Sequence, residues 1–189
     1  MNQRFLYWGI VAGGFVADQL VKSWVRGALP QHGGFDGKPW PGVFEITHVV
    51  NEGIAFGLFQ GYGVLLAPVA VGIVILTALY SARHPKESNW VHAAMALLAT
   101  GALGNLFDRI FHGRVTDMFQ IRAFNFPVFN VADVCITVAA TILILKWGID
   151  AVPHSHAPGP ETQADQEIAT PGVQELSPRV EPREAGRET

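Results

Sequence analysis

Two aspartates have the chemical type and the setting for acid–base catalysis. Asp117 lies in the segment Gly-Arg-Val-Thr-Asp-Met-Phe at 113–119, and Asp133 lies in Phe-Asn-Val-Ala-Asp-Val at 129–134. Both stand at the edges of apolar stretches, where an ionised carboxylate costs on the order of 3 kcal/mol or more. Two carboxyl groups that share one proton supply the base and the acid that amide hydrolysis by water requires. The pair therefore suggests one shared function.

Other catalytic groups have weaker support in the sequence. The seven histidines form no His-Glu-x-x-His pattern, and no serine lies in a Gly-x-Ser-x-Gly turn. The one cysteine, Cys135, can form neither an intramolecular disulfide nor a thiolate metal cluster. Glycine pairs such as Gly13-Gly14 are typical of close helix packing rather than of phosphate binding. We therefore expect neither a metal nor a cofactor.

The elements that must position the two aspartates are predicted to be membrane helices. Apolar residues make up 49% of the chain and charged residues 15%, and the mean hydropathy is +0.25. These values are typical of a small integral membrane protein. A cleaved signal peptide is disfavoured, because the first uncharged run ends at Asp18 without a small-x-small cleavage site. We predict an all-α membrane protein with four transmembrane helices, at residues 5–24, 61–82, 88–107 and 129–147.

Residues 151–189 differ in composition from the rest of the chain. They are rich in Pro, Glu, Thr, Gln and Ser, and they hold three arginines against seven acidic residues, a net charge of −4. Such a segment cannot bury enough apolar surface to fold, so we predict a disordered acidic tail after a membrane domain at residues 1–150. The whole chain carries −3, which leaves the membrane domain at +1. This charge gives no reason to expect a nucleic-acid partner.

Two connecting segments are expected on the same side of the helices. The first, residues 27–60, contains a β-branched and aromatic run at 43–50 that predicts a strand. Asn51 and a glycine-containing turn follow this run. The second segment, residues 108–128, is read as a loop that carries Asp117. The polar ends of the first, third and fourth helices should therefore gather beside a small β-containing loop region.

Several polar residues recur at helical spacing. Asp18 and Lys22 are four residues apart and Asn130 and Asp133 are three apart, so each pair shares a helix face. A third stripe of this kind runs through Gly101, Asn105 and Arg109. In a bundle these faces turn inward. A structural ion pair, interhelical hydrogen bonds and headgroup anchoring explain the same spacing as well as substrate contacts do.

Five motifs follow one another along the chain: Asp18-Gln-Leu-Val-Lys22, Asn51-Glu-Gly-Ile-Ala-Phe56, Gly101-Ala-Leu-Gly-Asn-Leu-Phe-Asp-Arg109, Val115-Thr-Asp117 and Phe129-Asn-Val-Ala-Asp133. In this order they resemble the lipoprotein signal peptidases, also called signal peptidase II. The resemblance covers about residues 5–148. It departs from the family pattern at Thr116, where an apolar residue is usual, and in the acidic tail. Neither departure touches a residue that the family's mechanism needs.

The resemblance implies an aspartic endopeptidase at the outer face of the bacterial inner membrane. Such an enzyme removes the signal peptide from a prolipoprotein by cleaving before a cysteine that carries diacylglycerol. Asp117 and Asp133 would form the catalytic dyad of a monomer surrounded by lipid. Both termini would be cytoplasmic, an orientation that the basic residues alone leave undecided. The residues that would shape the site and position substrate are Asp18, Lys22, Asn51, Gly101, Asn105, Arg109, Asn130 and Ala132.

Two other classes of function fit part of the sequence. A proton-coupled transporter would use Asp18, Lys22 and Asp133 as a relay, which requires ionisable groups at several depths. The middles of the second and third predicted helices contain none. A lipid-binding scaffold would use phenylalanines such as Phe56 and Phe59 as amphipathic surface elements. The scaffold hypothesis leaves the two aspartates without a function.

Overall fold

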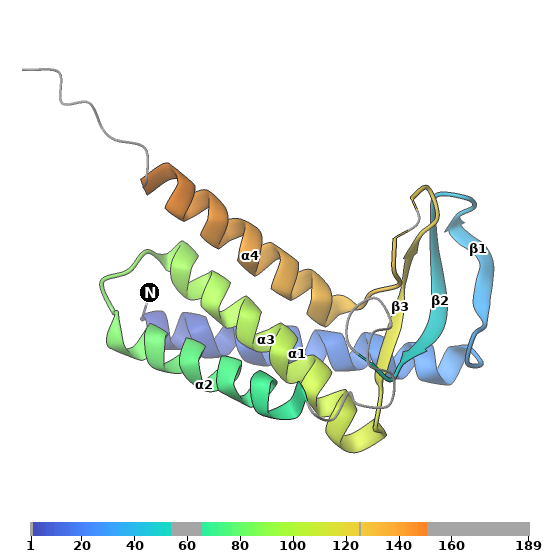
Figure 1. Cartoon of the computed structure of the whole chain (residues 1–189), viewed down its shortest axis with the longest axis horizontal. Helices are drawn as coiled ribbons and strands as arrows, with labels where there is room; N and C mark the ends of the chain where they lie inside the picture. Colours follow the sequence, from blue (N-terminus) through green and yellow to red (C-terminus); the bar gives the residue numbers. More distant parts are fainter. Residues whose placement is uncertain (1, 54–65, 125, 151–189) are drawn as a thin grey trace, which may run out of the picture. The chain divides into compact units, whose positions relative to one another are not determined.

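The computed structural model describes residues 2–53, 66–124 and 126–150, which form four helices and three strands (Figure 1). In chain order the elements are α1 (Gln3–Ala28), β1 (Gly34–Trp40), β2 (Phe44–Asn51), α2 (Ala67–Arg83), α3 (Asn89–His112), β3 (Val115–Ile121) and α4 (Val131–Asp150). The predicted tail at residues 151–189 lies outside the described residues, so its disorder stays a prediction.

Local sequence signals explain where the helices begin and end. Asn2 caps α1 by accepting a hydrogen bond from the backbone N–H of Arg4, and Ser88 caps α3 by accepting one from Val91. Both residues satisfy N–H groups that lack a partner in the first helical turn. Helix α3 ends at Gly113, whose φ of 70° is the left-handed conformation that glycine adopts without strain.

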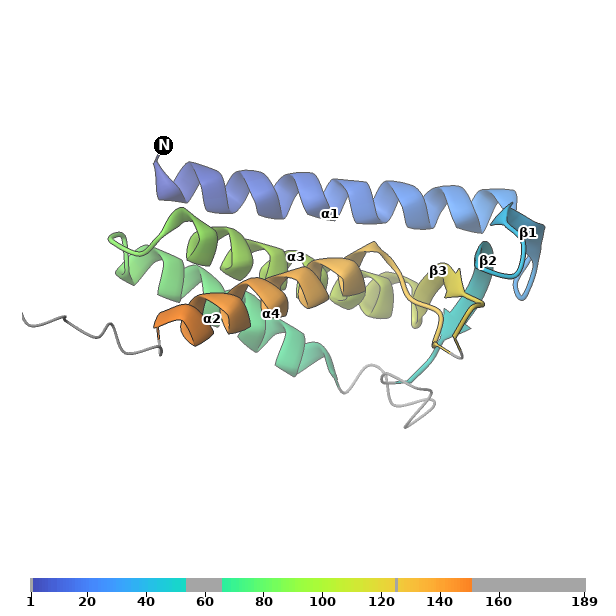
Figure 2. The ribbon, with the colours of Figure 1, turned by 90° about the horizontal axis from the view of Figure 1, so that it is seen from above.

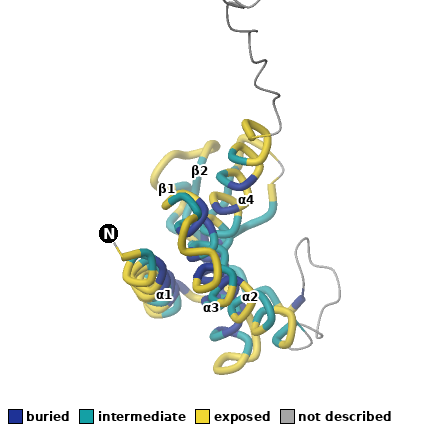
Figure 3. Tube along the Cα trace, turned by 90° about the vertical axis from the view of Figure 1, so that its left-hand side faces the viewer, coloured by how far each residue is buried: buried dark blue, intermediate teal, exposed yellow. Residues whose placement is uncertain are grey.

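Helix α3 is the centre of the described helices. It packs against α1, α2 and α4 (Figure 2), and buried residues gather on and around it (Figure 3). Against α1, Tyr7 and Val11 pack on Ala96 and Ala99. The small alanines allow the helix axes to approach closely, as is usual for helices in membranes. Against α4, the buried contact is made by Val91, Ala94, Ala139 and Leu143.

The three strands form one antiparallel sheet in the order β1-β2-β3. Strand β2 pairs with β3 so that Val49 lies opposite Asp117 and Val50 opposite Thr116. The sheet stands at the C-terminal end of α1 (Figure 1), where Met118 packs against Val25. The strand predicted at 43–50 is confirmed as β2. The prediction of a loop around Asp117 is wrong, because Asp117 lies within strand β3.

The helices differ from the predicted spans mainly at their ends. The third was predicted to end at residue 107, but α3 continues through His112, so Asp108 and Arg109 are helical rather than part of a loop. No glycine or proline occurs between residue 107 and Gly113, and the buried Asp108 pairs with Lys22 and Arg26 of α1. Residues 61–65 of the second predicted span lie outside the described residues. Within the described residues, α3 and α4 are long and apolar enough to cross a membrane, and α2 is a shorter apolar helix.

Candidate active site

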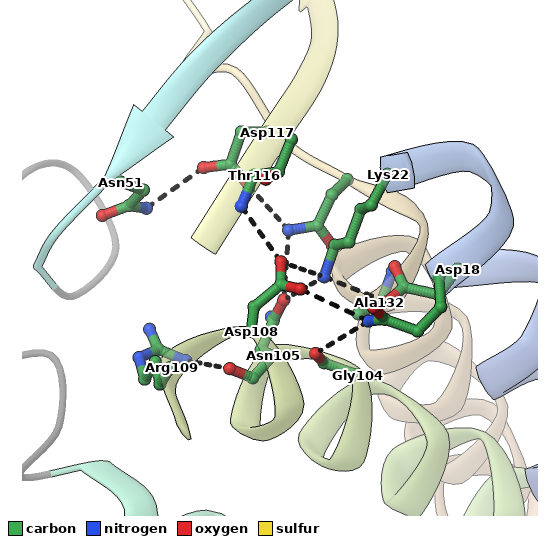
Figure 4. Close-up of polar contacts among 12 residues, drawn as sticks. Asp18, Lys22, Asn51, Gly104, Asn105, Asp108, Arg109, Thr116, Asp117 and Ala132 are labelled. Atoms are coloured by element: carbon green, nitrogen blue, oxygen red, sulfur yellow. Dashed lines mark hydrogen bonds and ion pairs between the residues drawn. The ribbon is translucent and has the colours of Figure 1, made fainter. Parts of the chain in front are cut away.

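Asp117 is held on β3 by two amide side chains. Its side chain is buried, with only 3% of the residue surface exposed. Oδ2 accepts a hydrogen bond from Asn51 Nδ2 at 3.1 Å, and Oδ1 accepts one from Asn130 Nδ2 at 2.6 Å. Asn51 is the last residue of β2, and Figure 4 shows its amide directed toward Asp117. The strand pairing therefore sets the first contact, and the start of α4 supplies the second.

Asp133 lies in the first turn of α4 and is oriented by the way this helix begins. Its Oδ2 accepts a hydrogen bond from the backbone N–H of Asn130 at 3.1 Å, while Asn130 Oδ1 accepts one from the N–H of Asp133 at 3.0 Å. This reciprocal pattern is a capping box, which satisfies two N–H groups at once. Asp133 Oδ1 also accepts a hydrogen bond from Asn105 Nδ2 at 2.9 Å. Helix α3 thus holds the second carboxylate oxygen.

Asn130 joins the two aspartates. It is fully buried, and its Nδ2 donates both to Asp117 Oδ1 and to Asn105 Oδ1, the latter at 3.1 Å. Its backbone N–H and its side-chain oxygen bind Asp133. One residue therefore contacts both carboxyl groups. The sequence spacing predicted that Asn130 and Asp133 share a face, and the structure adds Asp117 to the same network.

The surroundings of Asp117 favour its protonated form. Burial, followed by the negative charge of Asp133, raises the pKa of Asp117 from its ordinary value of 3.8 to about 7. The hydrogen bonds from Asn130 and Asn51 and the positive charge of Lys22 act in the opposite direction. Near neutral pH, Asp117 is therefore divided between its protonated and ionised forms, a state suited to a catalytic acid.

Lys22 is the centre of a buried ionic network next to the aspartates (Figure 4). Lys22, Asp18 and Asp108 are all fully buried. Lys22 Nζ lies 2.9 Å from Asp18 Oδ2 and 3.2 Å from Asp108 Oδ2, and it donates to Asn105 Oδ1 at 3.1 Å. The predicted contact between Asp18 and Lys22 is thus present, and Asp108 is added to it. Asp18 Oδ1 also accepts a hydrogen bond from the backbone N–H of Ala132 at 2.9 Å.

Two glycines of α3 allow the neighbouring helices to approach the site. A Cβ on Gly101 would lie 2.4 Å from the backbone oxygen of Ala132 and 2.4 Å from Ile136 Cγ1. A Cβ on Gly104 would lie 2.5 Å from Asp18 Oδ2. All three distances are shorter than real Cβ contacts, so a side chain at either position would force its neighbours to shift. Gly101 was predicted to shape the site, whereas Gly104 was missed, although its three-residue spacing from Gly101 places it nearby.

Arg109 faces the segment that follows β2. Its Nη1 donates to the backbone oxygen of Asn105 at 3.3 Å, and its Nη2 donates to the backbone oxygen of Gly53 at 3.2 Å. Its Nε is buried and has no hydrogen-bond partner among the described residues. The predicted site residue Arg109 thus holds the backbone just after Asn51, at the edge of the two-aspartate centre.

The structure brings all ten predicted residues into one region and adds others that sequence reasoning missed. The main additions are Asp108, which binds Lys22, and Gln19, whose Nε2 donates to Asp18 Oδ2 at 3.0 Å. Arg26 and Thr116 also contact Asp108. Gln19 and Asp108 both lie inside the five sequence motifs, next to Asp18 and Arg109, and this position could have identified them as site residues. No group of three His, Cys, Asp or Glu residues suited to a metal occurs in the described ranges.

The site can therefore provide acid–base chemistry by two carboxyl groups, and comparison with known proteins gives its family. A family model described as signal peptidase (SPase) II matches residues 10–148. The lipoprotein signal peptidase of Lactococcus lactis subsp. cremoris strain SK11 is 37% identical over 139 residues, which cover 72% of this chain and 89% of that protein. The lipoprotein signal peptidase of Gloeobacter violaceus is 33% identical over 165 residues, covering 87% and 92%.

Solved structures agree with this relationship at the level of the fold. A bacterial membrane enzyme determined by the in meso method superposes with a TM-score of 0.73 at 24% identity, covering 79% of this chain and 92% of that chain. A second structure of the same description gives a TM-score of 0.66 at 25% identity, covering 75% and 91%. The chain belongs to the signal peptidase II family and is a membrane peptidase, as its motifs predicted.

Proposed function

We propose that this peptidase removes the signal peptide from diacylglyceryl-modified prolipoproteins, with Asp117 and Asp133 as its catalytic dyad. The observation that carries the proposal is the contact of both carboxyl groups with the single buried residue Asn130. The relatives named lipoprotein signal peptidase support the substrate class. Cleavage occurs on the N-terminal side of the lipidated cysteine.

The two aspartates take different parts in the reaction. Asp117, with a pKa of about 7, holds the shared proton. Asp133 is less buried and accepts N–H hydrogen bonds at both oxygens, so it acts as the base. It removes a proton from water as the water oxygen attacks the scissile carbonyl carbon, and Asp117 gives its proton to the carbonyl oxygen. The tetrahedral diol then collapses: Asp133 protonates the leaving nitrogen, the C–N bond breaks, and a hydroxyl group of the diol gives its proton to Asp117 as the carbonyl forms again.

The neighbouring residues hold the dyad and the substrate in register. Asn51 donates to Asp117 and Asn105 donates to Asp133, and we propose that these hydrogen bonds orient the two carboxyl groups. Arg109 fixes the carbonyl of Gly53 beside Asn51, and we assign it the positioning of the peptide. Asp18 and Lys22 support this group from α1, and Gly101 and Ala132 permit the close approach of α3 and α4.

All four helices are proposed to cross the membrane in one domain at residues 1–150. At about 1.5 Å per residue, α1, α3 and α4 reach or exceed a hydrocarbon core of roughly 30 Å. The charges of Asp18 and Lys22 do not prevent α1 from crossing, because they are buried against each other and against Asp108. The termini are cytoplasmic and the sheet lies at the outer face. The enzyme acts as a monomer.

The dyad is tested with Asp117→Asn and Asp133→Asn. Each change keeps size and removes an ionisable proton, so we expect cleavage of a diacylglyceryl-modified substrate to fall at least about 10³-fold, in line with the loss of other catalytic groups. Purified protein in detergent is assayed by gel shift on the lipidated substrate and on its unlipidated counterpart. Near-normal turnover by either variant would refute the dyad. Equal cleavage of both substrates by the native enzyme would refute the substrate class.

A further inference from the structure

Strand β3, which carries Asp117, is an edge strand, and one of its outward N–H groups is bound by a buried carboxylate. The strand pairs with β2 on one side, and among the described residues its other side forms an isolated bridge between Phe119 and Phe129. On its other side, the backbone N–H of Thr116 donates to Asp108 Oδ2 at 3.1 Å. Asp108 is fully buried in the last turns of α3, and only Gly113 and Arg114 separate this helix from β3. A buried N–H without a partner would be costly, so Asp108 satisfies a specific need of the strand.

A second side chain holds the same residue from another helix. Arg26 Nη1, from the end of α1, donates to Thr116 Oγ1 at 3.1 Å and lies 3.4 Å from Asp108 Oδ1. Thr116 is thus bound through both its backbone N–H and its hydroxyl group. We call Arg26, Asp108 and Thr116 the β3 anchor.

The position of the β3 anchor in the chain gives it a direct effect on Asp117. Thr116 is the residue before Asp117, and Figure 4 shows Asp108 reaching Thr116 from α3. After Asp117, the outer edge of β3 is bound again: the N–H groups of Met118 and Phe119 donate to the Phe129 carbonyl at 3.0 and 2.8 Å. The backbone of Asp117 is therefore fixed on both sides. A displacement of about 1 Å at a reacting group can lower a rate about 100-fold.

We infer that Asp108 is a positioning residue for peptide cleavage, acting with Arg26 and Thr116 to set the place of the Asp117 carboxyl group. The inference rests on the proposed function, because it takes Asp117 as catalytic. Asp108 also neutralises part of the charge of Lys22, so its removal could weaken the fold without any effect on catalysis. The two roles differ in what they change: a positioning role lowers kcat in correctly folded enzyme, while the KM for substrate stays near its original value.

The first experiment compares Asp108→Ala with Asp108→Asn in purified, monodisperse enzyme. Asp108→Ala removes the acceptor of the Thr116 N–H, so we expect kcat to fall by roughly 10- to 100-fold with KM changed less than about twofold. Asp108→Asn keeps an oxygen that can accept this hydrogen bond and should recover part of the loss. Folded Asp108→Ala with a kcat within about twofold of the native enzyme would overturn the inference. Equal losses in the two variants would overturn it as well.

A second pair of variants decides the question if Asp108→Ala fails to fold. Thr116→Val removes the hydroxyl group and keeps the shape, and Thr116→Ser keeps the hydroxyl group. We expect Thr116→Val to lower kcat by about threefold in the native background and not at all with Arg26→Ala, because the hydroxyl acts through Arg26. Thr116→Ser should retain native kcat. Native kcat in Thr116→Val would overturn the role of the β3 anchor.

The outcome for Asp117→Asn separates this inference from the proposed function. If Asp117→Asn is inactive while the anchor variants are fully active, the dyad stands and the positioning role is wrong. If Asp117→Asn cleaves at the native rate, the proposed function fails, whatever the anchor variants do.

Discussion

The two ends of helix α3 bury very different side chains. The N-terminal half packs alanines and aliphatic residues against α1 and α4, with Ala96 and Ala99 on one side and Val91 on the other. The C-terminal half buries charged and amide groups, chief among them Asn105 and Asp108. The first half is stabilised by close packing, where a lost methyl group leaves a cavity. The second half is stabilised by mutual neutralisation, where one lost partner leaves an unpaired buried charge.

This difference shows in which half of α3 the fold contains buried charges that cost stability. At the N-terminal half, buried polar side chains form hydrogen-bonded pairs such as Tyr7 with Thr77 and Ser81 with His92. At the C-terminal half, Asp18, Lys22 and Asp108 are all buried beside the two-aspartate centre. Charges of this kind stabilise a fold poorly compared with apolar residues of the same size. Their concentration at one end is explained if that end carries the reaction.

The largest effect is expected when the buried lysine is removed. Lys22→Met leaves Asp18 and Asp108 without their shared partner, so we expect a loss of about 3–5 kcal/mol in stability and little folded protein. The matched control is Lys146→Met, because Lys146 forms a similar pair with Asp150 at an exposed site. Exposed pairs contribute little, so the control should melt like the native protein. Thermal unfolding in detergent measures the stability of both variants. Equal melting temperatures would contradict the claim that the buried charges at the C-terminal end of α3 depend on one another.

A large effect on activity is expected from a single methyl group at the helix contact. Gly101→Ala places a Cβ within 2.4 Å of the Ala132 backbone oxygen, so α3 and α4 must separate and displace Asp133 from Asn105. We expect cleavage to fall by roughly 100-fold. Gly9→Ala is the control, since nothing lies within 4 Å of a Cβ at that position. Equal turnover by both alanine variants would show that the close approach is not required.

A moderate loss of stability without loss of catalysis is expected when packing against the N-terminal half of α3 is disturbed. Leu143→Ala opens a cavity against Val91 and Ala94, so the free energy of unfolding should fall by about 2–3 kcal/mol. Leu143 lies on α4 about 15 Å along the axis from Asp133, at 1.5 Å per residue, and we expect kcat to remain unchanged. The two quantities are measured by thermal unfolding and by gel-shift cleavage. A parallel drop in kcat would mean that the two halves are not independent.

The smallest effect is expected from one neutral hydrogen bond. Tyr7→Phe removes the contact between the Tyr7 hydroxyl and Thr77 Oγ1, which are 3.0 Å apart. Thr77 keeps its hydrogen bonds to Ile73 and Val74 carbonyls, so we expect a loss of about 0.6 kcal/mol, the average for such bonds in membranes. If Tyr7→Phe lowered the stability as much as Leu143→Ala does, a single polar contact would contribute as much as apolar packing in the N-terminal half of α3, which would contradict this account.

The long apolar segments and the ordered motifs predicted much of this architecture. Long apolar runs predicted α3 and α4, and the β-branched run at 43–50 predicted β2, because these signals depend on local composition. The ten site residues were predicted from motifs and from the spacing of polar side chains. Their common location is consistent with that prediction, while their roles stay a proposal.

What the sequence did not predict depends on contacts between distant residues. Asp108 was assigned to a loop because a charged residue at the end of an apolar run resembles a boundary. It is helical and buried because Lys22 and Arg26 from α1 reach it. Strand β3 was missed since its pairing with β2 is set by residues far apart in the chain. The local sequence around Asp108 or around β3 does not show these distant contact residues.

The pH dependence of kcat/KM for a lipidated substrate tests the central claim most directly. The claim is that Asp117 must carry the shared proton, and burial raises the pKa of Asp117 to about 7. The proton is retained below this pH and lost above it, so kcat/KM should decline above about pH 7 and approach a tenfold loss for each further pH unit. A rate that stays constant from about pH 6 to about pH 9 would contradict the assignment of the catalytic proton to Asp117.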